Sequence, residues 1–585
     1  MKSTHQFLRV SWLLLAFIYC ALAPRQADAD LVPGCEGGYS FGGGPRTMTF
    51  TPNIQSFLNH NPAWTEAQIR RDLTAALEEW NAKGQANVRL VLSTGSTNLA
   101  GFKDDDLNVI SICDPSVSCT STSCCTAEAS CGGEDRSNCV GGFIGDSDVV
   151  LYDKAESNCE WLLQHQINND DDANVSVFRK VVHEVGHAVG IDHYSGGIYY
   201  ATVIEGAGWW TAGIDFNKYN ISWIDIAELR NIYGVRHSYI RWMTADDSGS
   251  PLDWPDTSST GFGSTLSDVG ALQNSQDTGY SVFFVRNSDN TQGGDAGNNS
   301  VTVYRDSGGW GHQTITAANS TGLRMLSGGA LTRTDQEYVV AWHDHNNQLR
   351  RQRTIGGGPT NWTSSTPVGF YTTHTAAAAC LASVDRLYLI WVINTPGHLS
   401  PGSTNHYQVA YTSSSDNGAT WSPAISVSFR SFRGLGFSCM NGLPQAPTWP
   451  CSLSYSSWST MKPVWRRVKP NAANPDLLVF DVEQPVSGPT TDFTSQGVGV
   501  TTGRAGATPL LVGTYNRNAD EPLPDYAARI VHAALGVGGS YDGRTLDVGG
   551  ASDVWIGDSY PLLGTPAITH FKPASYVYFL FTRKE

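Results

Sequence analysis

Hydrophobic positions in roughly the first 235 residues follow two periods, one typical of helices and one typical of strands. Apolar residues spaced three or four apart predict a helix that begins after Thr65: Ile69, Leu73, Ala76, Leu77 and Trp80. Two more helices are predicted over residues 175–189 and 222–233. Aliphatic runs predict strands at residues 47–50, 88–92, 107–112 and 144–152. This mixture predicts an α/β (α+β) domain over residues 30–237, with a cysteine-rich insertion at residues 113–159.

The hydrophobic pattern changes after about residue 236, where short apolar runs alternate with turns rich in Gly, Ser, Asn and Asp. Three of these runs contain Tyr280, Tyr338 and Tyr388. Each is followed by a second strand and then by a turn that ends in tryptophan: Trp310, Trp362 and Trp421. A repeat of about 50 residues is typical of β-propeller blades. We therefore expect residues 238–585 to form an all-β domain, a propeller of about six blades, with a pair of β-sandwiches as the alternative.

The N-terminus resembles an export signal. Lys2 and Arg9 precede an apolar stretch, and Ala27-Asp28-Ala29 offers a cleavage site, so residues 1–29 are expected to be removed from a secreted, extracellular protein. The apolar stretch is short for a membrane span, and no later segment is long enough, so we expect no transmembrane segment. The formal net charge of −16 disfavours nucleic acid as a partner.

Cysteines are unevenly distributed in this chain. Eight lie early, between Cys35 and Cys159, and three lie late, at Cys380, Cys439 and Cys451. In an exported protein such cysteines predict disulfides, with zinc ligation by the early set as the alternative. Cys439 and Cys451 are close enough along the chain to close a loop, which would leave Cys380 free and buried.

Residues 183–193 read HEVGHAVGIDH and carry the strongest chemical signal. His183 and His187 lie four apart, so they share one face of a helix and both imidazoles can reach one metal ion. Gly190 can end the helix with a positive φ, after which His193 can complete a three-histidine set. Three imidazoles leave zinc an open position for water, and Glu184 lies beside that position without being a ligand.

This arrangement predicts a secreted zinc metalloendopeptidase with one catalytic zinc ion. Zinc would lower the pKa of its water and polarise the scissile carbonyl. Glu184 would take the water proton as general base and pass it to the leaving amine as general acid. A protein or peptide is the expected substrate. An ordinary helix with histidines by accident is the alternative, and the number of fixed positions in the motif argues against it.

The extended motif resembles that of the metzincin zinc peptidases, and its flanks resemble the matrixin branch. The similarity covers about residues 45–235 and is carried by residues 65–91, 145–153 and 220–234. It implies a matrixin-like zincin fold, with His183, His187 and His193 as zinc ligands and Glu184 as the acid/base. It also implies that residues 145–153 form the edge strand beside the substrate cleft, and that residues 220–234 form the C-terminal helix.

The chain departs from that family in two respects. Metzincins have a methionine beneath the zinc, but no methionine lies between Met48 and Met243 here, and Ile204 is the best match to that position. No histidine occurs between His60 and His165, so ligands for a structural zinc are absent. A structural calcium ion is possible, but no clear motif in the sequence supports one.

Residues 414–421 read SSDNGATW and match the Asp box, a turn found in sialidases and other propellers. Its aspartate accepts backbone hydrogen bonds and its tryptophan packs between strands, so we interpret it as structural. We expect this half to bind the substrate, a carbohydrate or a cell-surface target, as a module separable from the peptidase. An adhesin with a weak or inactive protease, and a glycosidase with an accessory protease, are the alternatives.

Overall fold

The structure is a computed structural model, and for the strands within residues 238–333 and 492–584 it describes the backbone alone. The described residues are 46–84, 86–100, 107–113, 127–131, 147–152, 160–163, 166, 174–191, 221, 223–234, 238–246, 258–265, 270–271, 281–286, 300–306, 309–315, 330–333, 337–343, 348–355, 361–372, 376–393, 407–432, 434–439, 449–460, 462–485, 492–493, 498–502, 510–518, 527–535, 541–547, 563–571 and 576–584. None of the helices in these ranges is long and apolar enough to cross a membrane.

The N-terminal unit, described between residues 46 and 234, is built on a five-stranded mixed sheet with the order β2-β1-β3-β5-β4. Strands β1, β2, β3 and β5 are parallel, whereas β4 runs antiparallel to β5. Their bounds are β1 Arg46–Pro52, β2 Val88–Leu92, β3 Asn108–Cys113, β4 Ala127–Cys131 and β5 Ser147–Tyr152. A short parallel pair, β6 Glu160–Leu162 and β7 Asn174–Ser176, lies outside this sheet.

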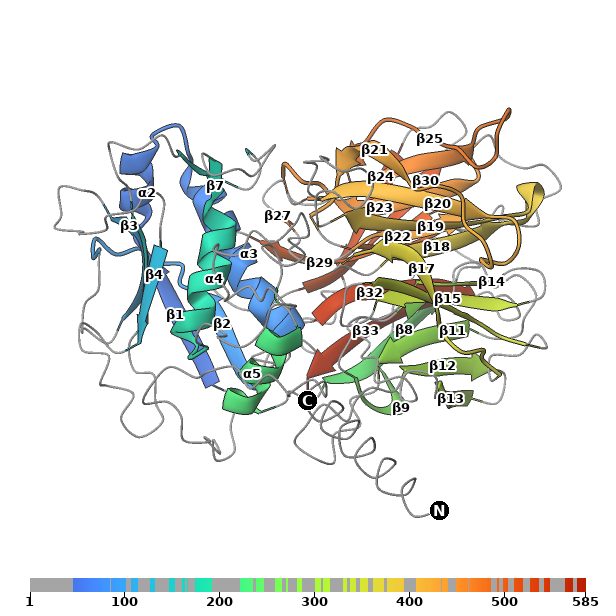
Figure 1. The fold of residues 1–585 in the computed structure, drawn as a ribbon, viewed down its shortest axis with the longest axis horizontal. Helices are drawn as coiled ribbons and strands as arrows, with labels where there is room; N and C mark the ends of the chain where they lie inside the picture. Colours follow the sequence, from blue (N-terminus) through green and yellow to red (C-terminus); the bar gives the residue numbers. More distant parts are fainter. Residues whose placement is uncertain are drawn as a thin grey trace, which may run out of the picture.

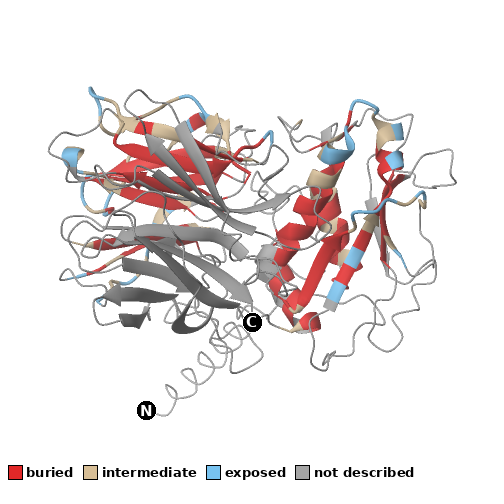
Figure 2. Ribbon diagram, turned by 180° about the vertical axis from the view of Figure 1, so that it is seen from behind, coloured by how far each residue is buried: buried red, intermediate tan, exposed pale blue. Residues whose placement is uncertain are grey.

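Four described helices accompany the sheet: α2 Ile54–His60, α3 Glu66–Gly84, α4 Val177–Ala188 and α5 Trp223–Tyr233. Helix α3 begins as its sequence predicts, because Gln68 N donates to Thr65 Oγ1 at 3.3 Å and Thr65 N donates to Gln68 Oε1 at 2.9 Å. Helices α3 and α4 pack against each other and lie between the mixed sheet and the second half of the chain (Figure 1). The apolar stripe of α3 is buried, as Figure 2 shows.

Strand β4 corrects the sequence analysis. Its residues, AEASC, lie in the predicted cysteine-rich insertion, where no strand was predicted for them, yet they pair with β5 along five positions. The predicted edge strand, residues 145–153, becomes β5, which has a neighbour on each side. The edge of the described sheet on this side is therefore β4. The sequence analysis also missed helix α2. Asn53 caps this helix, with its Oδ1 accepting a hydrogen bond from Ser56 N at 3.0 Å.

The second half of the chain forms six antiparallel sheets. Five are continuous in sequence: β10 to β13, β14 to β17, β18 to β21, β22 to β26 and β27 to β31. Strands of the first three are β10 Gly270–Ala271, β11 Ser281–Arg286, β12 Ser300–Asp306, β13 Gly309–Ile315, β14 Ala330–Arg333, β15 Tyr338–His343, β16 Gln348–Arg353, β17 Thr366–Tyr371, β18 Ala377–Leu381, β19 Arg386–Ile393, β20 Gln408–Ser414 and β21 Ile425–Arg430. A single 3₁₀ turn, η3 Ala382–Val384, follows β18.

The remaining strands complete the other three sheets. They are β22 Gly436–Cys439, β23 Cys451–Ser456, β24 Pro463–Pro470, β25 Leu478–Phe480, β26 Gln484–Pro485, β27 Asp492–Phe493, β28 Val498–Thr502, β29 Leu510–Asn518, β30 Ala527–Leu535, β31 Tyr541–Asp547, β32 Leu563–Phe571, β33 Tyr576–Lys584, β8 Ser238–Asp246 and β9 Ser258–Thr265. The sixth sheet has the order β32-β33-β8-β9, so it combines strands from both ends of this half.

The six sheets form a closed ring. One strand of each sheet contacts the corresponding strand of the next, in the order β10, β14, β18, β22, β28 and β32, and β32 contacts β10. This is a six-bladed β-propeller, as the repeat in the sequence predicts. The blade that joins β32 and β33 to β8 and β9 closes the ring with hydrogen bonds, for example in the pairing of Ile240 with Thr582.

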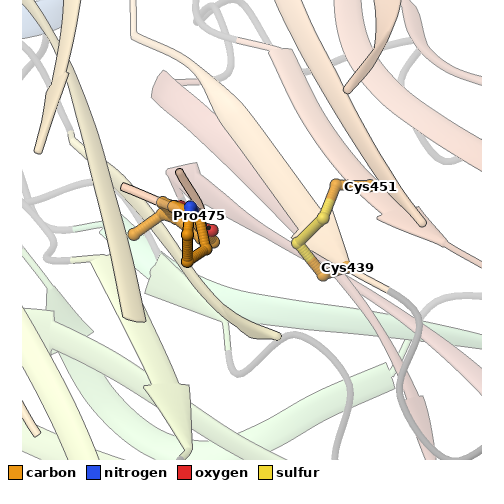
Figure 3. Close-up of a disulfide and its surroundings, with 4 residues drawn as sticks. Cys439, Cys451 and Pro475 are labelled. Carbon is orange, nitrogen blue, oxygen red and sulfur yellow. Dashed lines mark hydrogen bonds between the residues drawn. A yellow bond between two sulfur atoms is a disulfide. The ribbon is translucent and has the colours of Figure 1, made fainter. Parts of the chain in front are cut away.

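The late cysteines behave largely as their spacing predicts. Cys439 and Cys451 are opposite each other on β22 and β23 and form a disulfide (Figure 3). Cys380 lies outside that disulfide, and it is half-buried and not fully buried as predicted. The pairing of the early cysteines lies outside the described side chains, as does the predicted signal segment of residues 1–29.

Candidate metal centre

Helix α4 carries the candidate metal ligands, and its sequence explains why it forms and how it is oriented. Ser176 caps it, with its Oγ accepting from Arg179 N at 3.2 Å. One face of the helix is apolar and buried: Val177, Phe178, Val181, Val182, Val185 and Ala188. His183 and His187 are half-buried on a different face, and Glu184 is only 3% exposed. Burial of the apolar face therefore fixes where the two imidazoles point.

Side chains from three other elements donate hydrogen bonds to carbonyl groups at and just after α4. The bonds are Trp80 Nε1 of α3 to Val182 O at 2.8 Å, Ser147 Oγ of β5 to Ala188 O at 3.0 Å, and Tyr233 OH of α5 to Val189 O at 3.1 Å. The last two satisfy carbonyls at the C-terminal end of the helix, which have no partner within the helix itself. The helix is thus fixed to both the sheet and its neighbouring helices.

The chain turns at Gly190, as its sequence predicts. Gly190 has a φ of 98°, a conformation that other residues rarely adopt. Its N–H donates to His187 O at 2.8 Å, and Ile191 N donates to Gly186 O at 3.0 Å. The described chain ends at Ile191 here, so His193, the predicted third ligand, lies outside the described residues. Ile204, the predicted counterpart of the methionine, does so too.

His187 is held in the tautomer that metal binding requires. Its Nδ1 lies 2.7 Å from Ile191 O. A carbonyl oxygen can only accept a hydrogen bond, so Nδ1 donates and carries the proton. The Nε2 atom is then the unprotonated nitrogen and can bind a metal ion. The turn at Gly190 places Ile191 O at this position, so the backbone that ends the helix also orients the ligand.

His183, Glu184 and His187 form a cluster in which the potential ligand atoms lie within 4.8 Å of one another. The Nε2 atoms of His183 and His187 are 3.2 Å apart, and the two rings are nearly perpendicular at 86°. Ligands of a tetrahedral zinc ion at their usual bond length are about 3.3 Å apart. The described histidine pair therefore fits zinc. Glu184 Oε1 is 3.9 Å from His183 Nε2, beside the pair.

The structure thus brings together three of the four site residues that the sequence predicts: His183, Glu184 and His187. It adds the supports Trp80, Ser147 and Tyr233, which the sequence analysis missed as site residues. Trp80 was recognised only as a core residue, because its spacing in α3 predicts that it is buried but does not predict that its indole N–H donates a hydrogen bond. No local pattern links Ser147 or Tyr233 to a helix that lies elsewhere in the sequence.

The Asp box is a structural turn, as predicted. Asp416 Oδ1 accepts from Thr420 N at 2.8 Å, and Oδ2 accepts from Thr420 Oγ1 at 2.6 Å. Gly418 has a φ of 76°, and an added Cβ would lie 2.9 Å from the ring of Trp421. Arg351 of the neighbouring blade donates to Asn417 O at 2.7 Å. The turn therefore joins β20 to β21 and two blades to each other.

Arginines of the described blades are likewise committed to the propeller itself. Arg353 forms an ion pair with Glu337 at 2.7 Å, and Arg386 forms one with Asp476 at 2.9 Å. Arg467 is paired with Asp481. These three arginines are therefore held by carboxylates of the propeller.

No protein-family model and no curated protein sequence matches this chain. Three solved structures with similarity to this chain are distant in sequence. A Hadza microbial sialidase, Hz136, is 12% identical with a TM-score of 0.36, covering 55% of this chain and 66% of its own. A six-bladed fungal lectin from Aleuria aurantia is 10% identical with a TM-score of 0.33, covering 52% and 84%. A GH43_1 enzyme from Xanthomonas citri is 9% identical with a TM-score of 0.32, covering 47% and 89%.

These values are too low to carry an argument about function. The propeller assignment rests on the six sheets and their closure in this chain. The metal centre rests on α4 and its supports.

Proposed function

We propose that this protein is a secreted zinc-dependent metalloendopeptidase with a matrixin-like catalytic unit and a C-terminal β-propeller. The observation that supports this most is the disposition of His183 and His187, whose Nε2 atoms are 3.2 Å apart with Glu184 beside them. The resemblance of residues 183–193 to the metzincin motif supplies the third ligand, His193. The mixed sheet with α4 packed across it is consistent with such a unit.

His183 and His187 would hold the zinc ion together with His193. Zinc bound there would polarise the scissile carbonyl and lower the pKa of water. Glu184 is 3% exposed, and its Oε1 lies 3.9 Å from His183 Nε2, so its carboxylate lies beside the proposed zinc site. It takes a proton from the attacking water and then donates it to the leaving amine. Trp80, Ser147 and Tyr233 keep α4 in place while this happens.

The propeller supplies binding and not the reaction. The described arginines and the Asp box serve the fold of the blades, so nothing in them indicates a second active site. A carbohydrate or cell-surface target remains the proposed partner of this half. Binding energy from such a contact would act on large substrates and leave the cleavage of short peptides unchanged.

The function is tested by replacing Glu184 with Gln in the full chain. Glu184→Gln removes the proton acceptor but no ligand, so turnover of casein should fall by at least about 10²-fold. Zinc content, measured by atomic emission, should stay stoichiometric. Glu66→Gln, a variant of an exposed glutamate on α3, is the matched control and should keep full turnover.

Chelation completes the test. Removal of zinc should abolish casein cleavage by the wild type, and addition of zinc should restore it. Purified wild-type protein that holds zinc but cleaves neither casein nor unstructured peptides would overturn the peptidase and favour a binding protein. Undiminished turnover in Glu184→Gln would overturn the role of Glu184.

A further inference from the structure

The buried core of the N-terminal unit continues without interruption into the propeller. A single cluster of buried side chains includes Val182 and Val185 of α4 as well as Tyr407, Phe432 and Trp458 of the blades. Modules that work independently keep separate cores and meet across a more polar surface. The shared core therefore differs from the separable modules that the sequence predicts.

Phe178 makes the contact between the two halves. It lies at the second position of α4, and its ring meets that of Phe432 edge to face, with centroids 5.5 Å apart. Phe178 is 1% exposed and Phe432 is 0% exposed. Edge-to-face pairs of this kind are specific in geometry, because the positive ring edge faces the negative ring face.

Phe432 belongs to an aromatic socket, which we define as Tyr407, Phe432 and Trp458. Tyr407 stacks on Phe432 at 6.1 Å and meets Trp458 at 4.6 Å, and Phe432 lies 6.2 Å from Trp458. The guanidinium of Arg430 lies 5.8 Å from the Trp458 ring and covers the socket.

The socket is rigid because its backbone is hydrogen-bonded. Phe432 N donates to Ser456 O, and Ser431 N donates to Tyr407 O, both at 2.9 Å. Its three residues come from the connections β19–β20, β21–β22 and β23–β24. Two of these connections join the second strand of a blade to its third, and one joins the fourth strand of a blade to the first strand of the next. Because the strands of a blade are antiparallel, both kinds of connection lie on the same face of the propeller. The Asp box joins a third strand to a fourth and lies on the opposite face.

A second contact lies beside the socket. Arg71 Nη1 of α3 donates to Ser459 O, one residue after Trp458, at 3.3 Å. Helix α3 also contacts β32 of the closing blade. Since Trp80 of the same helix donates to Val182 O, the propeller is connected to α4 both directly and through α3.

We propose that the propeller is a positioning partner of the metal helix: the aromatic socket seats Phe178 and thereby holds α4, which carries His183 and His187. Phe178 lies five residues before His183, little more than one helical turn. A helix whose first turn is unseated keeps its bonds at Val182, Ala188 and Val189 but loses the support of its N-terminal end, so the imidazole pair is less firmly preorganised. This inference rests on the proposed metal site for its effect on zinc, but its effect on α4 does not need the metal.

The test uses the full chain and compares Phe432→Leu with Phe437→Leu. Both residues are fully buried phenylalanines of the propeller, but Phe437 faces Tyr388 within the blades at 6.5 Å. Hydrogen exchange over residues 177–188 is measured by mass spectrometry without metal. Zinc affinity is measured by competition with a chelator, and the visible spectrum of added cobalt(II) reports ligand geometry.

Phe432→Leu is expected to increase hydrogen exchange over α4 in the metal-free protein, to weaken zinc binding roughly 2- to 30-fold and to alter the cobalt spectrum. Phe437→Leu should lower the unfolding midpoint while leaving these three measurements at wild-type values. If Phe432→Leu leaves exchange over α4 as in Phe437→Leu, the proposal is overturned.

A second variant covers the case in which Phe432→Leu does not fold. Phe178→Leu changes the other side of the same contact, and it should produce the same faster exchange and weaker zinc binding. Where both variants fold, the effects of the double variant should be little larger than those of either single variant, because both substitutions remove the same contact. Fully additive effects would contradict the proposal. If even the wild type fails to bind zinc, the peptidase proposal falls, while exchange over α4 still decides whether the socket positions the helix.

Discussion

Gly190 illustrates how one residue's backbone serves the site. Its φ of 98° lets the chain turn after α4 and brings Ile191 O to His187 Nδ1. Gly190→Ala forces a side chain into this conformation, so the free energy of unfolding should fall by more than about 1 kcal/mol. Zinc affinity should fall as well, because the turn orients His187 and leads to His193. Urea unfolding and chelator competition measure the two effects.

The control for that experiment is Gly95→Ala. Gly95 lies in a loop without a positive φ, and its nearest neighbour, Ser93 Oγ, would be 3.4 Å from the added Cβ. Alanine fits there by ordinary contact, so stability and zinc affinity should stay near wild-type values. Equal losses in the two variants would mean that the backbone at Gly190 has no special role.

Asp416 gives a pH dependence that belongs to the propeller. Burial acts to raise the pKa of Asp416, but hydrogen bonds from Thr420, Ser414 and Ala419 outweigh it and lower the pKa below its usual value. A carboxylate whose pKa is lowered by folding stabilises the fold above its unfolded pKa. This contribution is lost as the pH falls through the folded pKa.

Asp416→Asn should therefore destabilise the chain at pH 7 and do so progressively less below about pH 4. The measurement is the urea midpoint of the variant and the wild type at pH 7, 5 and 3. A difference that stays constant over this range would mean that the charge of Asp416 is not what stabilises the Asp box.

At the scale of elements, α4 is stabilised by bonds from its neighbours as much as by its own sequence. Trp80→Phe keeps a ring in the core but removes the donor to Val182 O. The free energy of unfolding should fall by about 1 kcal/mol, since one buried hydrogen bond is lost. Zinc affinity should fall with it, because the bond fixes the middle of the metal helix.

Trp342→Phe is the matched control for that variant. Trp342 is also 1% exposed and also donates its indole N–H, in this case to Gln352 Oε1 at 3.0 Å within one blade. Its loss should lower stability by a similar amount and leave zinc affinity unchanged. Equal losses of zinc affinity in both variants would show that general destabilisation, and not the bond to α4, is responsible.

The elements that could be predicted from the sequence are those with a strong local pattern. Helix α3 has its cap and apolar stripe, and the HEVGH spacing places two candidate ligands on one face of α4, about one helical turn apart. Strand β4 could not be predicted, because AEASC has low strand propensity and gains its structure by pairing with β5. Sequence periodicity says which residues are buried, but it does not say which strand lies at the edge.

At the scale of the whole molecule, the propeller could be predicted because its repeat recurs along the chain, whereas its contact with α4 could not. Phe178 and Phe432 are far apart in sequence, and each looks like an ordinary core residue of its own half. Only the folded chain shows that they meet. The same holds for the closing blade, whose strands come from the two ends of the propeller sequence.

The closing blade predicts that the propeller needs its last strands. A chain that ends at residue 562 lacks β32 and β33, so β8 loses its partner β33 and the ring stays open. Such a chain should lose the cooperative unfolding transition and aggregate through its exposed strand edges. Size-exclusion chromatography and circular dichroism measure this. A compact monomer with the wild-type transition would contradict the prediction.

The same blade has a consequence for biosynthesis. Strand β8 emerges from the ribosome long before β33, its partner on one side, so this pairing forms only after the roughly 330 intervening residues have been made. Pairing of such distant segments makes folding slow. A slow closing step keeps the ring of blades open for longer. Helix α4 lies earlier in the chain than the aromatic socket, so it receives the support of the socket only after residues 407–458 have been made.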